Sequence, residues 1–164
     1  MQMLVISDTH GDGSVLSRIL LKHPLCELVI HCGDGERELD DFLELHPDWR
    51  SRCYHVCGNC DSTERSPRIL TLDLPYGHRV TAVHGHYYLY GDIQNNLIQL
   101  AKSQGSDLML FGHFHTRCDT VIDGVHLFSP GSAACPRDGK PAAYGLIDIL
   151  KCGILTSHGE VSLL

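Results

Sequence analysis

The first third of the chain alternates between short apolar runs and amphipathic stretches. Apolar runs at residues 3–6, 27–31 and 52–56 predict three buried strands. Between them, apolar residues recur at helical spacing across residues 15–20 and 39–43, which predicts two helices. Strands that alternate with helices form parallel sheets with crossover helices, so this part of the chain predicts a parallel sheet.

The rest of the chain is richer in strands. Apolar runs at residues 69–74 and 79–84 flank Pro75-Tyr76-Gly77, which is a turn signal. Asp92 is placed to cap a helix that carries the apolar residues between 93 and 101. A buried strand at residues 108–111 is followed by four strands of antiparallel character, at residues 120–122, 125–128, 144–150 and 154–158. We therefore expect a second sheet, and two packed sheets flanked by helices are the simplest arrangement of both parts.

Length, composition and charge narrow the class of protein. A chain of 164 residues with 43% hydrophobic and 20% charged residues fits one domain over residues 1–164 with its own core. No apolar run approaches the ~20 residues that span a bilayer, and the N-terminus lacks the basic region of a signal peptide. We expect a cytoplasmic protein that binds no membrane and keeps its eight cysteines reduced. The formal net charge of −7 gives no general attraction to nucleic acid.

Short polar clusters follow five of the predicted strands. Ligands of open α/β sheets bind at the carboxyl ends of strands, so these clusters can converge on one site. The glycines beside them let the backbone turn sharply and approach a ligand closely. The clusters are Asp8-x-His10, Gly33-Asp34, Gly58-Asn59, His84-Gly85-His86 and Gly112-His113-x-His115.

These clusters carry donors that suit divalent transition metals. Carboxylate, amide and imidazole groups favour Mn²⁺, Zn²⁺, iron or Ni²⁺ and suit Cu(I) poorly. Twelve histidines in a chain of this length also point to metal. The set is too large for one tetrahedral zinc and suits two cations about 3.5–4 Å apart that share a bridging carboxylate. The candidate ligands are Asp8, His10, Asp34, Asn59, His84, His113 and His115.

The five motifs, in this order along the chain, resemble those of the calcineurin-like metallophosphoesterases. They read Asp8-Thr9-His10, Gly33-Asp34, Gly58-Asn59-Cys60-Asp61, His84-Gly85-His86 and Gly112-His113-Phe114-His115. The chain is most similar to the small, single-domain, phosphodiesterase-like branch of that superfamily, over roughly its whole length. The resemblance implies an α/β fold, a four-layer αββα sandwich of two mixed β-sheets flanked by helices.

The resemblance also implies how the ligands are shared between two divalent metal ions. It implies that one ion is bound by Asp8, His10 and His115 and the other by Asn59, His84 and His113. Asp34 would bridge the two. Manganese is the expected metal, with nickel, zinc or iron as alternatives. A hydroxide bridging the ions would attack phosphorus in line.

Cys60 departs from the pattern of many relatives, which carry histidine at this position to protonate the leaving group or hold the phosphate. A thiol is a poorer proton donor near neutral pH than imidazolium. We expect good leaving groups to be favoured and His86 to assist, so that the catalytic residues are Asp34, Asn59, Cys60 and His86. A supporting role for His86, or none, is an equal alternative. Histidines outside the motifs, among them His31 and His55, are expected at ordinary polar positions.

The sequence therefore predicts a binuclear metal-dependent phosphodiesterase that acts on a small phosphate ester. One alternative is a phosphomonoesterase that uses the same metals. Another is a protein-binding scaffold of the same fold, as in retromer, although all seven ligand positions are filled here. A metal-binding protein without turnover is a third. A homo-oligomer is possible, but no feature of the sequence identifies its interface.

Overall fold

The computed structural model describes residues 1–62 and 65–163. One five-stranded sheet, sheet A, has the strand order β10-β9-β1-β2-β3. Its strands are β1 (Gln2–Ile6), β2 (Leu28–His31), β3 (Cys53–His55), β9 (Ala143–Leu150) and β10 (Gly153–Glu160). The strands β1, β2 and β3 are parallel, and the β9–β10 hairpin pairs antiparallel with β1. Sheet A is therefore mixed.

The second five-stranded sheet, sheet B, has the order β4-β5-β6-β8-β7. Its strands are β4 (Ile69–Asp73), β5 (Arg79–Val83), β6 (Leu108–Phe111), β7 (Arg117–Ile122) and β8 (Val125–Pro130). The three inner strands β5, β6 and β8 are parallel, and the outer strands β4 and β7 are antiparallel to their neighbours. This sheet is also mixed.

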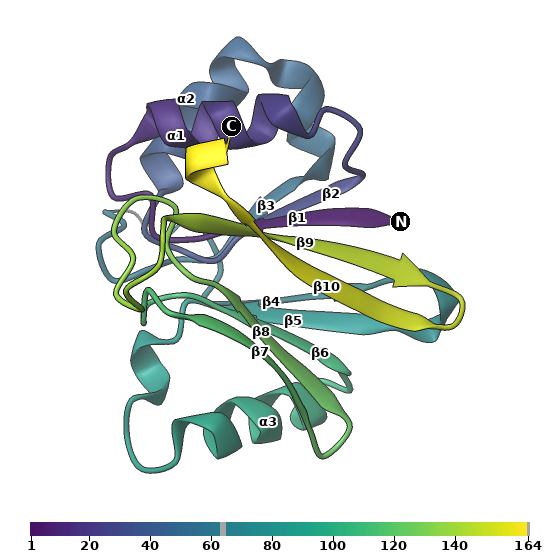
Figure 1. Cartoon of the computed structure of the whole chain (residues 1–164). Coiled ribbons are helices and arrows are strands. Elements are labelled where there is room, and N and C mark those ends of the chain that lie inside the picture. The colour runs from purple at the N-terminus through teal and green to yellow at the C-terminus, as the bar shows by residue number, and fades with distance from the viewer. Residues whose placement is uncertain (63–64, 164) are drawn as a thin grey trace.

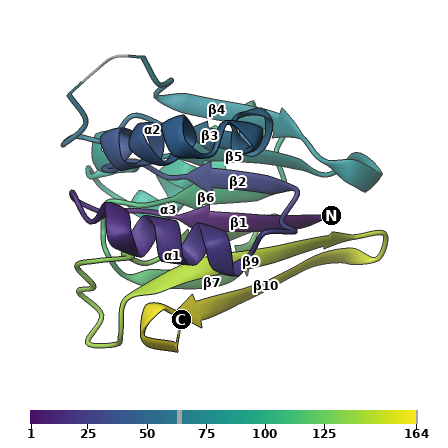
Figure 2. The same cartoon turned by 90° about the horizontal axis from the view of Figure 1, so that it is seen from above.

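Helices cover the outer faces of both sheets (Figure 1). The helices α1 (Gly13–Lys22) and α2 (Glu36–Leu45) lie side by side over sheet A, as the view from above also shows (Figure 2). The helix α3 (Ile93–Ser103) lies against sheet B. Four short 3₁₀ helices complete the described chain: η1 (Pro47–Arg52), η2 (Pro75–Gly77), η3 (His86–Tyr88) and η4 (Val161–Leu163). The expected four-layer αββα sandwich is confirmed.

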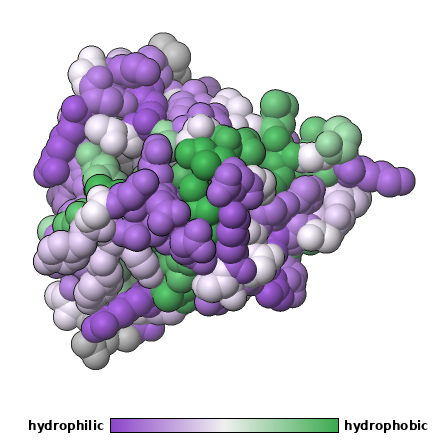
Figure 3. Space-filling view, turned by 90° about the horizontal axis from the view of Figure 1, so that it is seen from below, coloured by the Kyte–Doolittle hydropathy of each residue, from purple (hydrophilic) through white to green (hydrophobic). Residues whose placement is uncertain are grey.

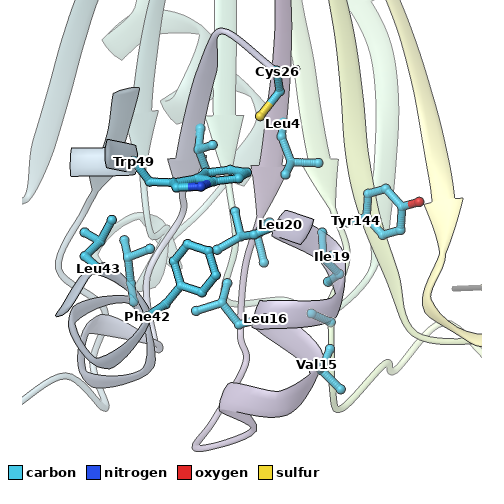
Figure 4. Packing of buried hydrophobic residues seen from close by; sticks show 14 of the residues in the cluster. Leu4, Val15, Leu16, Ile19, Leu20, Cys26, Phe42, Leu43, Trp49 and Tyr144 are labelled. Carbon is cyan, nitrogen blue, oxygen red and sulfur yellow. The ribbon is translucent and has the colours of Figure 1, made fainter. Parts of the chain in front are cut away.

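Strand β1 is buried on both faces, which explains its continuous apolar run. Leu4 and Ile6 point into the cluster under α1 and α2, whereas Met3 and Val5 point between the two sheets. In the first cluster Phe42 of α2 packs edge-on against Trp49 at 5.4 Å between ring centroids (Figure 4). These fully buried side chains fix β1 in the centre of the molecule, and with it the loop that begins at its carboxyl end.

The distribution of strands between the sheets differs from the expectation. The last two strands do not join the second sheet, because β9 pairs with the free edge of β1, with Met3 opposite Ile147. This pairing removes an exposed edge from the parallel strands. The expected antiparallel character of the strands after residue 111 is confirmed for the pairs β7–β8 and β9–β10. The strands β5 and β6, joined by the crossover helix α3, are parallel.

The face beneath sheet B is largely hydrophilic, with hydrophobic residues gathered near its centre (Figure 3).

Within the described residues, every helix is too short or too polar to cross a membrane.

Candidate metal centre and active site

The loops that follow β1, β2, β3, β5 and β6 meet at one edge of the sandwich, on the left in Figure 1. A continuous chain of contacts links the seven candidate ligands in these loops. They are Asp8, His10, Asp34, Asn59, His84, His113 and His115. The structure therefore brings together every metal ligand predicted from the sequence.

One group of donors combines the first and the last motif of the chain. Asp8 Oδ1 lies 3.1 Å from His115 Nε2 and 3.7 Å from His10 Nε2. The two imidazole Nε2 atoms of His10 and His115 are 3.0 Å apart. Three donor atoms this close to one another can bind one cation.

A second group forms around the side-chain oxygen of Asn59. Asn59 Oδ1 lies 3.1 Å from His84 Nε2 and 2.9 Å from His113 Nδ1. Asp34 lies between the two groups: its Oδ2 is 3.3 Å from His84 Nε2 and 3.9 Å from His10 Nε2. A carboxylate in this position can contact two cations at once.

Hydrogen bonds from outside the groups orient the donors. The Nδ1 atoms of His84 and His115 lie 2.7 Å from the backbone carbonyls of Cys32 and Cys135, so that each Nε2 faces the other donors. Metal-binding histidines are commonly held in this way. Ser7 Oγ donates to Asp8 Oδ2 at 2.5 Å.

One buried atom lacks a hydrogen bond where a metal would satisfy it. Asp8 is completely buried, and its Oδ1 receives no hydrogen bond of good geometry from the described residues. Burying a carboxylate oxygen without a hydrogen bond costs free energy unless a cation or another hydrogen-bond donor contacts it. The donor set and this orphaned oxygen both fit a bound divalent metal.

The backbone of these loops is held in a sparsely populated conformation. Five of the seven candidate ligands have positive φ angles: Asp8 (56°), His10 (45°), Asp34 (58°), His113 (67°) and His115 (56°). Non-glycine residues seldom adopt such angles, and those that do cluster at functional sites. Gly58 lets the Asp34 loop pack closely against it, because a Cβ atom at this position would collide with the carboxylate of Asp34.

The charges in the site favour an ionised Asp34. Burial opposes that charge, but the contact with His84 and the hydrogen bond from the Cys60 N–H outweigh it and hold the pKa of Asp34 well below its ordinary value. Burial also opposes a charge on His84, yet the nearby Asp34 and Asp8 raise its pKa. The contact with Asp8 raises the pKa of His115 despite burial.

These raised pKa values predict that protons compete with metal for the site. Metal binds the neutral imidazole, and His84 and His115 hold a proton to a higher pH than an ordinary histidine. Lowering the pH from about 8 to about 6 should therefore weaken Mn²⁺ binding by more than about tenfold. Isothermal titration calorimetry in buffers of different ionisation enthalpy measures both the affinity and the protons released. An affinity that is the same at both pH values would contradict this account.

The two other residues predicted to act in catalysis, Cys60 and His86, lie beside different donors. The backbone N–H of Cys60 donates to Asp34 Oδ1 at 2.7 Å, and its thiol lies within 4.8 Å of donor atoms of Asp34 and His10. Burial and the charge of Asp34 raise the pKa of this thiol to about 11. The ring of His86 lies 5.3 Å from that of His84. Burial lowers the pKa of His86.

Asp61 has a role that sequence reasoning did not assign. Its carboxylate accepts four backbone N–H groups, from Asp34, Gly35 and Glu36 in one loop and from Gly58 in another, at 2.7–3.0 Å. It thereby fastens the loop of Asp34 to the loop of Asn59 and caps the N-terminus of α2. In the sequence, only the position of Asp61 directly after Cys60 in the motif signals this role. Three of its four hydrogen-bond partners lie 25 to 27 residues away along the chain, so no local pattern reveals them.

His31 and His55 are not at ordinary polar positions, contrary to expectation. His31 is completely buried, and its ring stacks on that of His55 at 5.0 Å between centroids. Thr9 Oγ1 lies 3.3 Å from His31 Nε2, and Asp61 Oδ2 lies 3.5 Å from His55 Nε2. The two rings fill the space directly behind the loops of the site.

Comparison with known proteins shows what the chain is similar to. Residues 1–151 match the model of the calcineurin-like phosphoesterase superfamily domain. A probable metallophosphoesterase of Bacillus subtilis, YsnB, is 31% identical over 150 residues, which cover 91% of this chain and 85% of the relative. The phosphodiesterase YfcE of Escherichia coli is 31% identical over 100 residues, 57% of this chain and 50% of the relative.

Solved structures show the same fold. A predicted phosphoesterase of Streptococcus pneumoniae superimposes with a TM-score of 0.82 at 24% identity, covering 98% of this chain and 90% of the other. Vps29 of Entamoeba histolytica, solved in complex with zinc, gives a TM-score of 0.73 at 19% identity, covering 98% of this chain and 99% of the other.

Proposed function

The chain belongs to the calcineurin-like phosphoesterase superfamily, and from this premise we propose that it is a binuclear metal-dependent phosphodiesterase. The observation that carries the proposal is the place of Asp34. Its Oδ2 lies within 3.9 Å of His10 Nε2 on one side and within 3.3 Å of His84 Nε2 on the other. Two separate groups of donors joined by one carboxylate are what a two-metal site requires.

The proposed ligands divide as the donor groups do. One metal would be held by Asp8, His10 and His115 and the other by Asn59, His84 and His113, and Asp34 would bridge them. When bound, two divalent cations would make a water molecule nucleophilic and would offset the charge of the phosphoryl oxygens. Manganese is the expected metal, and nickel, zinc or iron also suit these donors.

The chain's own groups favour substrates with good leaving groups. With a pKa of about 11, the Cys60 thiol holds its proton too tightly to act as an efficient acid near neutral pH. His86, whose ring lies 6.1 Å from that of His113, is placed to contact a leaving group or the phosphate. The proposed substrate is therefore a small phosphodiester whose leaving group departs without strong acid assistance.

We propose a cytoplasmic location for the reaction.

The proposal is tested by hydrolysis of an aryl phosphodiester and the matching monoester. Protein stripped with a chelator should be inactive, and Mn²⁺ should restore cleavage of the diester in preference to the monoester. A preference for the monoester would keep the metal centre but refute the diesterase assignment. Full metal occupancy with no turnover of either ester would favour a scaffold, a role that the fold shared with Vps29 leaves open.

Replacing Cys60 with histidine should change the choice of substrate without removing metal. An imidazolium at this position can protonate a poorer leaving group, so the ratio of monoester to diester hydrolysis should rise by about tenfold or more. Metal content should stay the same, because Cys60 is not among the proposed ligands. Rates on both esters and the metal content of Cys60→His and of Cys60→Ser measure the effect. Loss of one metal from both variants would instead identify Cys60 as a ligand.

A further inference from the structure

Two hollows with different linings adjoin the candidate metal centre. The first, of about 550 Å³, is lined by His10, Asp34 and Cys60 and by the carboxylates of α2, and we call it the acidic hollow. The second, of about 750 Å³, is lined by Asn59, Pro67, Arg68, His86 and Tyr87 among others, and we call it the tyrosine hollow. Because each contains a proposed metal ligand, a phosphodiester at the centre can extend one substituent into each hollow.

The acidic hollow is a poor place for an anionic or electron-rich substituent. Its α2 side carries Glu36, Glu38, Asp40, Asp41 and Glu44, whereas its cationic side chains are Arg37 and Arg65. The imbalance repels negative charge near the surface. An anionic or electron-rich substituent of a phosphodiester would therefore lie more favourably in the tyrosine hollow.

The tyrosine hollow offers a ready-made surface for a planar ring. The guanidinium of Arg68 lies 5.1 Å from the ring centroid of Tyr87, and the ring of His86 lies 4.0 Å from it. Tyr87 as a whole residue is nevertheless 54% exposed, so part of it remains open to a ligand. Aromatic and guanidinium planes of this kind stack on aryl groups and nucleobases.

The wall of this hollow is tied to the metal loops. The backbone N–H of Cys57 donates to the carbonyl of Pro67 at 2.9 Å, which joins the strand end before Asn59 to the segment that carries Arg68. Asn59 in turn belongs to the second donor group. The Arg68 side of the hollow is thus held in place relative to Asn59 before a ligand binds, which lowers the entropic cost of binding a ring there.

We propose that the tyrosine hollow binds a planar aromatic group of the phosphodiester substrate, with Tyr87 and Arg68 as the residues that select it. This inference rests on the proposed function and specifies its substrate class. It assigns specificity to Tyr87 and Arg68, which line the same hollow as Asn59 but are not among the proposed metal ligands.

The test uses three esters with the same p-nitrophenyl leaving group, whose other substituent is methyl, phenyl or thymidine-5′-yl. Their kcat/KM values are compared in the wild type, Tyr87→Ala, Arg68→Ala and Tyr90→Ala. Tyr90 is 86% exposed and does not line the hollow, so it is the matched control. Dividing each value by that of the methyl ester, and then by the same ratio in the wild type, cancels the intrinsic reactivity of the esters.

Tyr87→Ala should lower the preference for the phenyl and thymidine esters over the methyl ester by about tenfold. Arg68→Ala should lower it by a smaller factor, and Tyr90→Ala should keep it. An equal loss on all three esters with unchanged metal content would mean that the shared p-nitrophenyl ring lies against Tyr87, which also supports the inference. Unchanged kcat/KM values on all three esters would overturn it. If the wild type cleaves none of the esters, the proposed function fails instead. In that case, the affinity of thymidine 5′-phosphate for the wild type and for Tyr87→Ala is measured by calorimetry. Binding that is weaker in Tyr87→Ala supports the assignment of the tyrosine hollow, and no binding to the wild type refutes it.

Discussion

Replacing Asp34 with asparagine is expected to weaken the binding of both metals together and to lower diester hydrolysis by more than about a hundredfold. The expectation follows from the position of one carboxylate between two groups of donors. An amide keeps the shape but loses the charge that offsets two cations, and its NH₂ group cannot act as a ligand. A residue that served one metal alone would leave the other in place.

Metal content by mass spectrometry and kcat/KM on an aryl diester measure this effect. Asp73→Asn is the matched control, because Asp73 lies on β4 with a side chain that is 78% exposed and pairs with Arg79. The control should bind metal and turn over as the wild type does. Retention of one metal at full affinity in Asp34→Asn would show that Asp34 does not bridge.

Replacing Asp61 with alanine should damage both folding and metal binding. Its side chain is 5% exposed and accepts four backbone N–H groups, which would all lose their partner. We expect the free energy of unfolding to fall by at least about 3 kcal/mol, which corresponds to a Tm lower by about 10 °C. The loops of Asp34 and Asn59 would then no longer be fastened together, so metal affinity should fall by about tenfold or more.

Asp61→Asn separates the two effects. The amide oxygen can still accept from one pair of N–H groups, while the NH₂ group faces the other pair, so this variant should fold and bind metal with intermediate affinity. Thermal unfolding and Mn²⁺ titration of both variants measure the outcome. Wild-type metal affinity in a folded Asp61→Ala protein would contradict the role we assign to this carboxylate.

Features set by neighbouring residues were predictable from the sequence. The apolar run of β1 is buried on both faces, as a central strand must be. The polar residues that follow the strands lie together because parallel strands end at the same edge of a sheet. For this reason the positions of Asp8, Asp34 and His113 along the chain were enough to propose them as ligands.

Features set by distant parts of the chain were not predictable. The pairing of β9 with β1 joins residues 140 to 146 positions apart, and no local pattern specifies it. The third strand is shorter than expected, because residues 47–52 form a 3₁₀ helix. Arg52 leaves the strand to donate to the carbonyls of Pro24 and Cys26 and to lie over the ring of Trp49.

The buried polar groups behind the site were the main feature of it that was not predicted from the sequence. His31 occupies a strand that is buried throughout, and a histidine within an apolar run gives no sign of whether it faces solvent or another ring. Its partner His55 arrives from the next strand, in register at the same level of the sheet. Only the pairing of β2 with β3 brings the two rings together behind the loops of the donors.

The most direct test of the central claim is the anomalous diffraction of Mn²⁺-loaded crystals at the manganese edge. The account predicts two peaks about 3.5–4 Å apart, one on each side of the Asp34 carboxylate. One peak should be bounded by Asp8, His10 and His115 and the other by Asn59, His84 and His113. A single peak at full occupancy, or peaks away from Asp34, would contradict a bridged two-metal centre and the phosphodiesterase proposal built on it.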